Sequence, residues 1–549
     1  MSSNTPIPYS WAEVPLGILA EKITKGSTPT TYGYSFQSTG INFFKVENVK
    51  AGVIDLASIV DFISDEANEN QKKSQLSVND VLFSIAGTIG EITIIKEVHF
   101  PANTNQAFAI ISGYDSALSP KFLEHQLRSF VTQRTKSKAR GGAMNNVSLG
   151  DLKELGVFVP PLNEQHRIVT KIEELFSELD QGIESLKRAR EQLKVYRQAL
   201  LKHAFEGKLT EQWRKDNADA AQGSASVAGG QEPGATKLET ADQLLERIKQ
   251  ECEARYQQQL EEWKGAVKQW EAGGKEGKKP GKSRPAKPLI VDPEVAVTLP
   301  DLPIEWAWLL LGENNVDVFD GPFGSNLKTS DYVDEGVRVI RLENIGSQKF
   351  IDEKKSFISE EKYQQLKKHT VWSGDLVFSS FVTENTRVAL VPDSINMAVN
   401  KADCFCVRTF GKTLDERFLE TYLSTRFVFK SIESLVHGVG RPRINTTQLK
   451  NIPIPMTSIA EQREIMGKLD MQLSEVSKLE EDIDSNLVRS EALRQSILKK
   501  AFSGHLVPQD PNDEPASLLL ERIAKEKAEA VALAKKARSV KKTAARRKT

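Results

Sequence analysis

The sequence is poor in cysteine and has no long apolar run. Cys252, Cys404 and Cys406 are the only thiols among 549 residues, which excludes a disulfide framework and favours a reducing compartment. No apolar stretch reaches the roughly 18 residues that a membrane-spanning helix needs. The chain also does not open with the basic and apolar regions of a signal peptide. These absences predict a cytoplasmic protein that is not inserted in a membrane.

Net charge is absent as well. The 74 basic residues are balanced by 74 acidic residues, so the bulk charge does not indicate a nucleic-acid partner. It does not exclude such a partner either, because binding depends on where the charges lie rather than on their sum. A length of 549 residues exceeds what one hydrophobic core supports and predicts two to four domains.

The sequence lacks a recognisable catalytic motif. The run Gly277–Ser283 is one residue too short for a phosphate-binding loop, and no strand pattern precedes it. Cys404 and Cys406 would share one face of a strand without a second ligand pair nearby, which favours core packing over zinc. There is no glycine loop or Asn/Asp-Pro-Pro-aromatic box of a methyltransferase, and no nucleophile elbow. We therefore expect no catalytic residue, metal or cofactor in this chain, while scattered Asp, Glu and Lys leave a nuclease centre open.

What the sequence does contain is an internal repeat. The segments Leu152–Leu209 and Leu449–Leu506 align without a gap at an offset of 297 residues, and 17 of their 58 positions are identical. Average residue usage would give only about three identities. A chain with two copies of one unit usually presents two similar surfaces, so its target is expected to have two parts.

Each copy of the repeat carries the heptad pattern of a long coiled-coil helix. Ser458 and Glu461 predict a capping box at the start of the second helix. Two helices, at about 162–205 and 459–502, are expected to pack antiparallel. The main seam comprises Ile172, Leu179, Leu186, Leu193 and Leu200 in copy one, and Leu469, Val476, Ile483 and Ile497 in copy two. A second seam position is assigned to Ile168, Leu175, Ala189 and Tyr196, and to Ile465, Leu479 and Leu493.

Short β-branched and aromatic segments bounded by Gly, Asn or Asp precede each helix and predict strands. They lie at 41–46, 81–85 and 107–111 in the first half, and at 337–342, 375–378 and 404–407 in the second. Because these regions repeat only faintly, the two domains should share a fold while their surfaces have diverged. The predicted fold class is α+β, with two strand-rich domains separated by two long antiparallel coiled-coil helices in a pseudo-twofold internal repeat.

Connectors complete the predicted organisation. Residues 216–236 and 273–288 have the composition of mobile linkers, and Thr240 with Gln243 caps a helix between them. The predicted segments are 1–159, strand-rich domain 1; 160–211, long helix 1; 212–300, linkers with a helix at 240–271; 301–456, strand-rich domain 2; 457–508, long helix 2; and 509–549, a helical or disordered basic tail.

Basic and amide side chains stand among turn residues in both strand-rich domains. Arg and Lys pair with phosphates and guanine edges, Asn pairs with adenine, and glycine lets the backbone come close. A solvated loop is the alternative for each, but similar loops in both halves favour function. The candidate DNA-binding residues are Lys25, Ser27, Thr28, Lys45, Asn48, Lys136, Lys138 and Arg140 in the first domain, and Ser325, Asn326, Lys328, Arg341, Asn344, Arg441 and Arg443 in the second.

Both copies carry a set of short motifs around the helix: Pro161–Gln165 and Ile459–Gln462 at the helix starts, Asn146–Leu149 and Asn445–Leu449 before them, and Leu200–Leu209 and Ile497–Gly504 at the helix ends. With these motifs the chain resembles, over nearly its whole length, the specificity (S) subunit of type I restriction-modification systems, in particular the longer subclass. Copy two departs from the pattern in having Ser458-Ile459 where copy one has Pro161-Leu162.

The resemblance implies two target recognition domains, each of which reads one half of a split, asymmetric site in double-stranded DNA. The helices would fix the distance between the domains and dock two modification (methyltransferase) subunits that bind S-adenosylmethionine. Restriction (translocase and nuclease) subunits that use ATP and Mg would join them. This chain would then recognise the DNA site and hold the complex together, and it would not carry out catalysis.

Two alternatives stay open from the sequence. An enzyme with its own methyltransferase or nuclease centre would bind adenosylmethionine as an isolated chain. A coiled-coil adaptor unrelated to DNA would lack sequence-specific, salt-sensitive DNA binding.

Overall fold

The computed structural model divides the chain into two compact units, each treated separately below. Unit 1 comprises Met1–Lys187 and Ile483–Thr549, and unit 2 comprises Arg188–Asp482. The structure describes residues 7–50, 52–114, 116–138, 147–225, 239–282, 291, 293–313, 316–411, 413–433, 435, 442–526, 528–529 and 532, without the side chains of 132–138 and 219–225.

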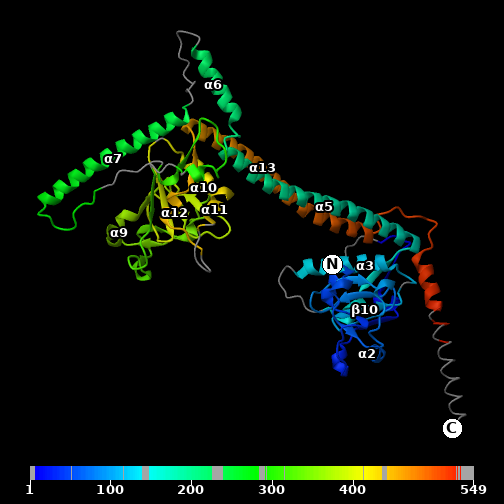
Figure 1. Cartoon of the computed structure of the whole chain (residues 1–549). Coiled ribbons are helices and arrows are strands. Elements are labelled where there is room, and N and C mark those ends of the chain that lie inside the picture. Colours follow the sequence, from blue (N-terminus) through cyan, green and yellow to red (C-terminus); the bar gives the residue numbers. More distant parts are fainter. Residues whose placement is uncertain are drawn as a thin grey trace. The chain divides into compact units, whose positions relative to one another are not determined.

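Unit 1 contains a strand-rich domain whose sheets pack around more than one apolar cluster. Its strands are β1 (Ala12–Pro15), β2 (Lys22–Lys25), β3 (Ile41–Phe44), β4 (Val49–Lys50), β5 (Val53–Ile54), β6 (Phe62–Ile63), β7 (Val81–Ser84), β8 (Ile92–Ile94), β9 (Ala102–Thr104), β10 (Phe108–Ser112) and β11 (Gly156–Val159). Its helices are α1 (Leu16–Leu19), α2 (Asp65–Asn70), α3 (Pro120–Lys138) and α4 (Leu149–Glu154). An antiparallel sheet has the order β2-β10-β7-β8, and a smaller sheet, β6-β3-β9, contains the parallel pair of β3 and β9. One face of β7 and β10 packs in the core that includes residues of α3 (Figure 1), and the other face packs in a second cluster with Phe44 of β3.

Unit 2 contains a second domain with a related arrangement. Its strands are β12 (Ala307–Leu310), β13 (Val316–Asp320), β14 (Tyr332–Val333), β15 (Val337–Ile340), β16 (Phe357–Ile358), β17 (Thr370–Trp372), β18 (Leu376–Ser379), β19 (Val388–Leu390), β20 (Met397–Asn400), β21 (Cys404–Thr409) and β22 (Pro453–Met456). Its helices are α6 (Glu211–Ala225), α7 (Ala241–Ala272), α8 (Pro293–Ala296), α9 (Glu360–Leu366), α10 (Glu416–Leu423), α11 (Arg426–Glu433) and α12 (Thr446–Lys450). The sheet β13-β21-β18-β19 matches β2-β10-β7-β8, and the parallel pair of β15 and β20 matches β3 and β9. The sheet with this parallel pair has five strands, β14-β16-β15-β20-β17, instead of three. The six strands expected from the sequence are confirmed to within two residues at either end.

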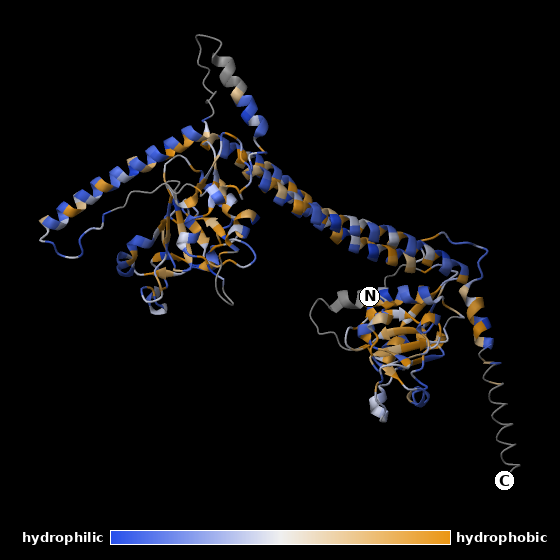
Figure 2. Ribbon diagram, in the orientation of Figure 1, coloured by the Kyte–Doolittle hydropathy of each residue, from blue (hydrophilic) through white to orange (hydrophobic). Residues whose placement is uncertain are grey.

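The two long helices are α5 (Leu162–Phe205) and α13 (Ile459–Phe502), and each contributes one half to each unit. Within unit 1 Arg494 pairs with Asp180, and within unit 2 Arg197 donates to Ser477 at 3.1 Å and lies 3.3 Å from Glu480. Higher numbers on α13 thus meet lower numbers on α5, which is the antiparallel pairing that the heptads predicted. Figure 2 shows apolar residues gathered in the strands of each domain and polar residues along the outer helix faces.

The main seam lies in the helix interface, whereas the predicted second seam position is confirmed only in part: Ile168 and Ile465 are buried, and Leu175 and Ala189 are partly buried. Tyr196, Leu479 and Leu493 are 50–51% exposed. The residues that follow them are Arg197, Glu480 and Arg494, and these make the cross-helix contacts given above. A search for leucines missed this register because charged side chains with long apolar stems can fill a seam position while their ends remain solvated. Of the main seam, Ile172, Leu200, Leu469, Val476, Ile483 and Ile497 are buried, and Leu179, Leu186 and Leu193 are partly buried.

Parts of the predicted linkers form a helix or a turn, and residues 283–288 of the second linker lie outside the described residues. The segment 216–225, expected to be a linker, belongs to α6, and the rest of that linker lies outside the described residues. The capping box of Thr240 and Gln243 is confirmed at the start of α7. After α7 the chain turns back along the helix, where Trp263 and Trp270 donate to the carbonyls of Pro280 and Gly277 at 3.0 and 3.3 Å. In the tail, residues 516–526 are helical and pack on the core of unit 1.

Candidate nucleic-acid interface

A glycine begins the loop that follows the outer strand of the main sheet in both domains. A Cβ on Gly26, after β2, would lie 2.1 Å from the Asn105 carbonyl oxygen. A Cβ on Gly321, after β13, would lie 2.2 Å from the Lys401 carbonyl carbon. Only glycine permits such a close approach of two backbones, so the repeated glycine fixes where each loop begins.

Some predicted contact residues of these loops are hydrogen-bonded within their own domain, and others are exposed to solvent. Ser27 Oγ lies 3.1 Å from Gln71 Oε1 and 2.9 Å from Ser74 Oγ, and Thr28 donates to Gln106. These two hydroxyls therefore hold the loop to its own domain. The side chains of Lys25, Ser325, Asn326 and Lys328 are exposed and can meet a ligand.

A second pair of predicted residues builds an identical turn in both domains. The amide oxygens of Asn48 and Asn344 accept from the backbone N–H of Lys45 and Arg341 at 2.8 and 2.9 Å. The amide nitrogens donate to carbonyls, and the two Asn residues are 5% and 1% exposed. Buried amides that are already bonded cannot also bind a base without breaking the turn, so we do not propose base contacts for Asn48 and Asn344.

The cations of these turns lie nearer the solvent. Lys45 pairs with Asp61 at 2.5 Å. The Arg341 side chain is 38% exposed, with its guanidinium 3.4 Å from Glu343 and 5.7 Å from the Tyr332 ring centroid. Both cations have acidic neighbours, so a phosphate would have to compete with a carboxylate for each.

Arg443 stands on an isolated bridge to Phe381. Its guanidinium lies 4.1 Å from the ring centroid of Phe381 and 3.1 Å from Asp403, and its side chain is 49% exposed. Stacking on an aromatic ring leaves the donors of an Arg directed outward in the ring plane, which suits a contact to DNA. Lys136 and Lys138 lie on α3 with side chains outside the described set, and Arg140 and Arg441 lie outside the described residues.

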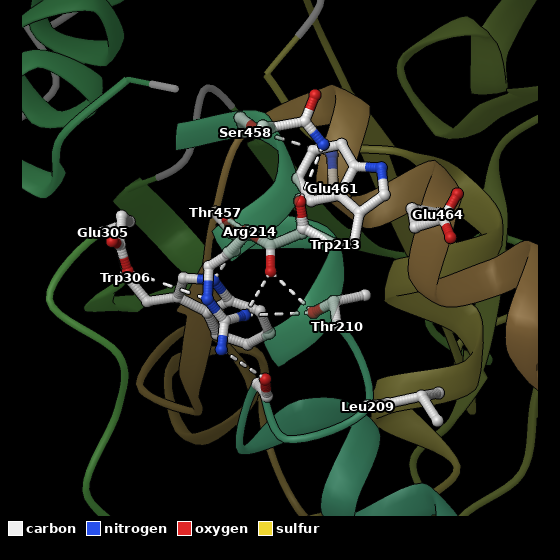
Figure 3. A network of polar contacts seen from close by, with 12 residues as sticks. Leu209, Thr210, Trp213, Arg214, Glu305, Trp306, Thr457, Ser458, Glu461 and Glu464 are labelled. Carbon is white, nitrogen blue, oxygen red and sulfur yellow. Dashed lines mark hydrogen bonds and ion pairs between the residues drawn. The ribbon is translucent and has the colours of Figure 1, made fainter. Parts of the chain in front are cut away.

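A buried carboxylate anchors the second domain to the start of α13 (Figure 3). Glu461 is 1% exposed, and its Oε2 accepts from Trp306 Nε1 at 2.9 Å and from Thr457 Oγ1 at 2.6 Å. Its Oε1 accepts from Thr210 Oγ1 at 2.6 Å and pairs with Arg214. The predicted capping box is therefore half formed: Ser458 Oγ accepts from the Glu461 N–H, but the carboxylate binds these other donors instead of the Ser458 backbone.

Unit 1 builds a matching anchor with partly different donors at the start of α5. Glu164 Oε2 accepts from Trp11 Nε1 at 3.0 Å, and its Oε1 accepts from Gln509. Burial is the main cause that raises the pKa of the Glu164 carboxyl, although the bonds from Trp11 and Gln509 oppose the rise. A neighbouring ion pair joins Arg167 to Asp513 at 2.6 Å.

The glutamine after each glutamate completes the attachment. Gln165 Nε2 donates to the carbonyls of Ala117 and Pro160 at 3.0 and 2.9 Å, and its Oε1 accepts from the Ser119 N–H. Gln462 makes the equivalent bonds to Thr413, Thr457 and Asp415. Both glutamines are fully buried. The repeated Glu-Gln pair thus fixes the orientation of each domain on its helix.

The sequence marked the Glu-Gln pairs as parts of the repeat, and Glu461 also as part of a predicted capping box, but it did not predict that they bind the domains. The signal for their partners is a second, shorter repeat, in which Pro8-x-x-Trp11 returns as Pro303-x-x-Trp306. Its tryptophans bind the repeated glutamates, and its prolines lie where a Cβ on Gly504 or Gly207 would clash. The positions of the two tryptophans relative to the repeat could have been found from this motif, but their hydrogen bonds to the glutamates could not.

The two thiols of β21 pack in the core of unit 2. Cys404 and Cys406 are fully buried among Ile340, Val371 and Val377. Burial raises the pKa of the Cys404 thiol to about 12 and that of Cys406 well above its usual value. No cluster of metal-ligating side chains occurs within the described ranges, and no described helix has both the length and the apolar character to cross a bilayer.

The fold and the anchors define a class: two related strand-rich domains, each fixed to one of two antiparallel helices. The family model of the type I restriction modification DNA specificity domain matches residues 8–188 and 325–487. The chain is similar to the type I restriction enzyme EcoBI specificity subunit of Escherichia coli, with 32% identity over 250 residues, or 45% of this chain and 48% of that subunit, about half its length. It is 23% identical over 422 residues to the EcoDI specificity subunit of Escherichia coli, covering 75% of this chain and 77% of that one.

A solved structure shares the fold. A chain from work on the complex assembly and conformational transition of the type I restriction-modification system aligns with a TM-score of 0.58 at 18% identity, over 91% of this chain and 100% of that chain. The chain belongs to the family of type I restriction modification DNA specificity domains and carries that domain twice.

Proposed function

We propose that this chain is the DNA-reading subunit of a type I restriction-modification complex, with residues 1–159 and 301–456 as its two target recognition domains. The single observation that supports this most is the repeated attachment of a domain to a helix through Glu164-Gln165 and Glu461-Gln462. Two domains held by equivalent Glu-Gln anchors present equivalent faces, so each is suited to one half of a bipartite site. The divergence of their loops then makes the site asymmetric.

Partners follow from the same proposal. Two methyltransferase subunits would dock on α5 and α13 and bring S-adenosylmethionine, while restriction subunits would bring ATP and Mg. The chain itself would be non-catalytic and would work in the cytoplasm, where the complex meets DNA. Among the described residues, Lys25, Ser325, Asn326, Lys328, Arg341 and Arg443 are the side chains best placed to meet DNA.

The experiment that tests the function is mapping of methylated adenine across the genome, with and without the gene for this chain. The expected result is one bipartite motif that disappears when the gene is removed. An unchanged set of methylated motifs would contradict the proposal. Binding of adenosylmethionine by the isolated chain would instead favour an enzyme with its own centre.

Domain exchange tests the assignment of one half-site to each domain. Replacing residues 1–159 by the matching domain of a relative should change one half of the methylated motif. The other half and the spacer should stay as they were, because α5 and α13 are retained. A change in both half-sites would mean that the two domains read DNA jointly.

A further inference from the structure

The sheet edge of unit 2 carries a hollow with three lysines that the predicted contact set did not include. The hollow has a volume of about 640 Å³ and runs along β13, the outer strand of its sheet. Lys367 and Lys368, from the turn after α9, and Lys450, the last residue of α12, line it together with Trp372 and Arg408. The two lysines of the turn are exposed, and Lys450 is half-buried.

The other charges of this hollow are matched within the protein. Arg408 lies 2.6 and 2.9 Å from the two carboxylate oxygens of Asp375, and Asp317 pairs with Arg255 at 2.7 Å. Within the described part of the chain, no carboxylate forms an ion pair with Lys367, Lys368 or Lys450. Three uncompensated positive charges therefore remain around one hollow and favour an anionic ligand.

The lysine pair is repeated in unit 1 at the same point of the fold. Ser64 caps α2 and Ser359 caps α9, each by accepting a backbone N–H. Lys72-Lys73 and Lys367-Lys368 follow these caps at the same spacing. Lys72 forms an exposed ion pair with Glu69 at 3.0 Å, for which a phosphate would have to compete.

In both turns the residues on either side of the lysines are buried, and the lysines themselves are exposed. Gln71 and Ser74 flank the first pair, and Leu366 and His369 flank the second. Packing therefore determines the flanking residues but not the lysines, and their recurrence on otherwise diverged surfaces needs another cause.

The third lysine is repeated as well, and both sets lie beside the predicted recognition loops. Lys153 on α4 matches Lys450 on α12, and each of these short helices packs beside the outer strand of its sheet. In unit 1 the turn of the lysine pair is bonded to the loop through Ser27, Gln71 and Ser74. In unit 2 the ring of His369 bonds the Asp320 carbonyl at 2.6 Å, directly before the loop that begins at Gly321.

We propose that these two lysine sets, Lys72, Lys73 and Lys153 in unit 1 and Lys367, Lys368 and Lys450 in unit 2, bind the sugar-phosphate backbone of duplex DNA beside each half-site. The inference rests on the proposed function. It adds a contact to the DNA backbone that does not depend on the base sequence and is common to both domains. Lysine is suited to this role because its ammonium is a point charge that meets a phosphate without demanding a fixed geometry. The variable loops would then read bases while the lysines hold the duplex.

The test uses the full chain assembled with methyltransferase subunits and a labelled 30-base-pair duplex of arbitrary sequence, titrated over a range of KCl concentrations. The triple variant Lys367→Gln, Lys368→Gln and Lys450→Gln should reduce the slope of log affinity against log salt by about 0.9 for each lost phosphate contact. The matching variant Lys72→Gln, Lys73→Gln and Lys153→Gln should act alike. The control Lys278→Gln, Lys349→Gln and Lys355→Gln removes three exposed lysines of unit 2 outside the hollow and should leave the slope within about 0.5 of the wild type.

Each contrary outcome overturns the inference in its own way. If the hollow and control variants had equal slopes, the change in salt dependence would reflect only the loss of net positive charge and not a contact at the hollow. An unchanged slope with self-association of the hollow variant would mean that the lysines only protect a sheet edge, a common use of edge lysines. An unchanged slope with loss of methyltransferase subunits would assign the hollow to a protein partner. Failure of the wild-type complex to bind any duplex would contradict the proposed function itself.

Discussion

In unit 2 the buried Glu461 carboxylate pairs with the Arg214 guanidinium, whereas in unit 1 the matching Glu164 carboxylate accepts from the neutral amide of Gln509. The tryptophan donor is the same in both, and so is the helix position. The cation has moved in unit 1, where Arg167 pairs with Asp513 beside the glutamate instead of with it. The comparison teaches that the repeat retains the buried acceptor and its tryptophan, while the segment that supplies the remaining donors has been free to change.

The faces that carry the candidate DNA contacts have diverged further than the anchors. Both retain the glycine that begins the loop, the turn held by Asn48 or Asn344, and the exposed lysine pair. The loop itself is fixed by Ser27 and Thr28 in unit 1, while its counterpart in unit 2 exposes Ser325 and Asn326. Backbone geometry is thus shared where the loop begins and is lost where base reading is proposed, as expected of two domains that read different half-sites.

The largest effects are expected at the seam and should be equal in the two units. Ile172 and Leu469 are equivalent and fully buried, so a change of either to Lys should cost at least about 3 kcal/mol of unfolding free energy by cavity and charge burial together. Urea unfolding measures the cost, and hydrogen exchange of β1 and β12 peptides assigns it to a unit. Leu479→Lys is the control, because that side chain is 51% exposed and should change stability by no more than about 0.5 kcal/mol. An equal cost at Leu479 would refute the corrected register.

The next effect should separate the two anchors. Arg214→Met leaves the Glu461 carboxylate buried without its cation and should cost about 3–5 kcal/mol. Gln509→Met removes one neutral donor from Glu164 and should cost about 0.5–1.5 kcal/mol. Urea unfolding of both variants gives the comparison, and the double variant Arg214→Met, Glu461→Gln should recover most of the loss. Equal costs for the two single variants would show that the charge of Arg214 is immaterial.

The glycines that follow the long helices should behave alike. Gly207 and Gly504 have φ of 73° and 74°, and a Cβ on them would lie 2.4 and 2.2 Å from Cγ of Pro303 and Pro8. Changing either to Ala should cost about 1–3 kcal/mol, because the left-handed backbone is strained for any residue with a Cβ. Thermal unfolding of the two variants tests this, with Gly182→Ala on the open face of α5 as a control that should not destabilise. A clear difference between Gly207 and Gly504 would break the equivalence of the two helix ends.

The sequence predicted the repeat, the long helices and most strands because these depend on local apolar periods. It failed at three residues of the second seam position, Tyr196, Leu479 and Leu493, whose neighbours Arg197, Glu480 and Arg494 make the cross-helix contacts instead. It also failed for the capping box of Glu461, because a local motif does not reveal donors that come from distant residues such as Thr210 and Trp306. The loop contacts were predicted by residue type alone, and so buried Asn48 and Asn344 were taken together with exposed Lys25 and Lys328. Exposure depends on tertiary packing and cannot be read from the turn.

The smallest effect is a pH dependence confined to the anchor of unit 1. Burial raises the pKa of the Glu164 carboxyl in the folded chain above its unfolded value. The stability that a raised carboxyl pKa contributes is fully present below the unfolded pKa, about 4.3, and is lost as the pH rises through the folded pKa. The free energy of unfolding of the wild type should therefore increase relative to that of Glu164→Gln as the pH falls from 7 towards 4. Urea unfolding at a series of pH values measures this difference, in which the titration of all other groups cancels. A flat difference, or one that grows in the opposite direction, would mean that the bonds from Trp11 and Gln509 outweigh burial, and that the neutral donors of unit 1 hold a carboxylate as well as Arg214 does in unit 2.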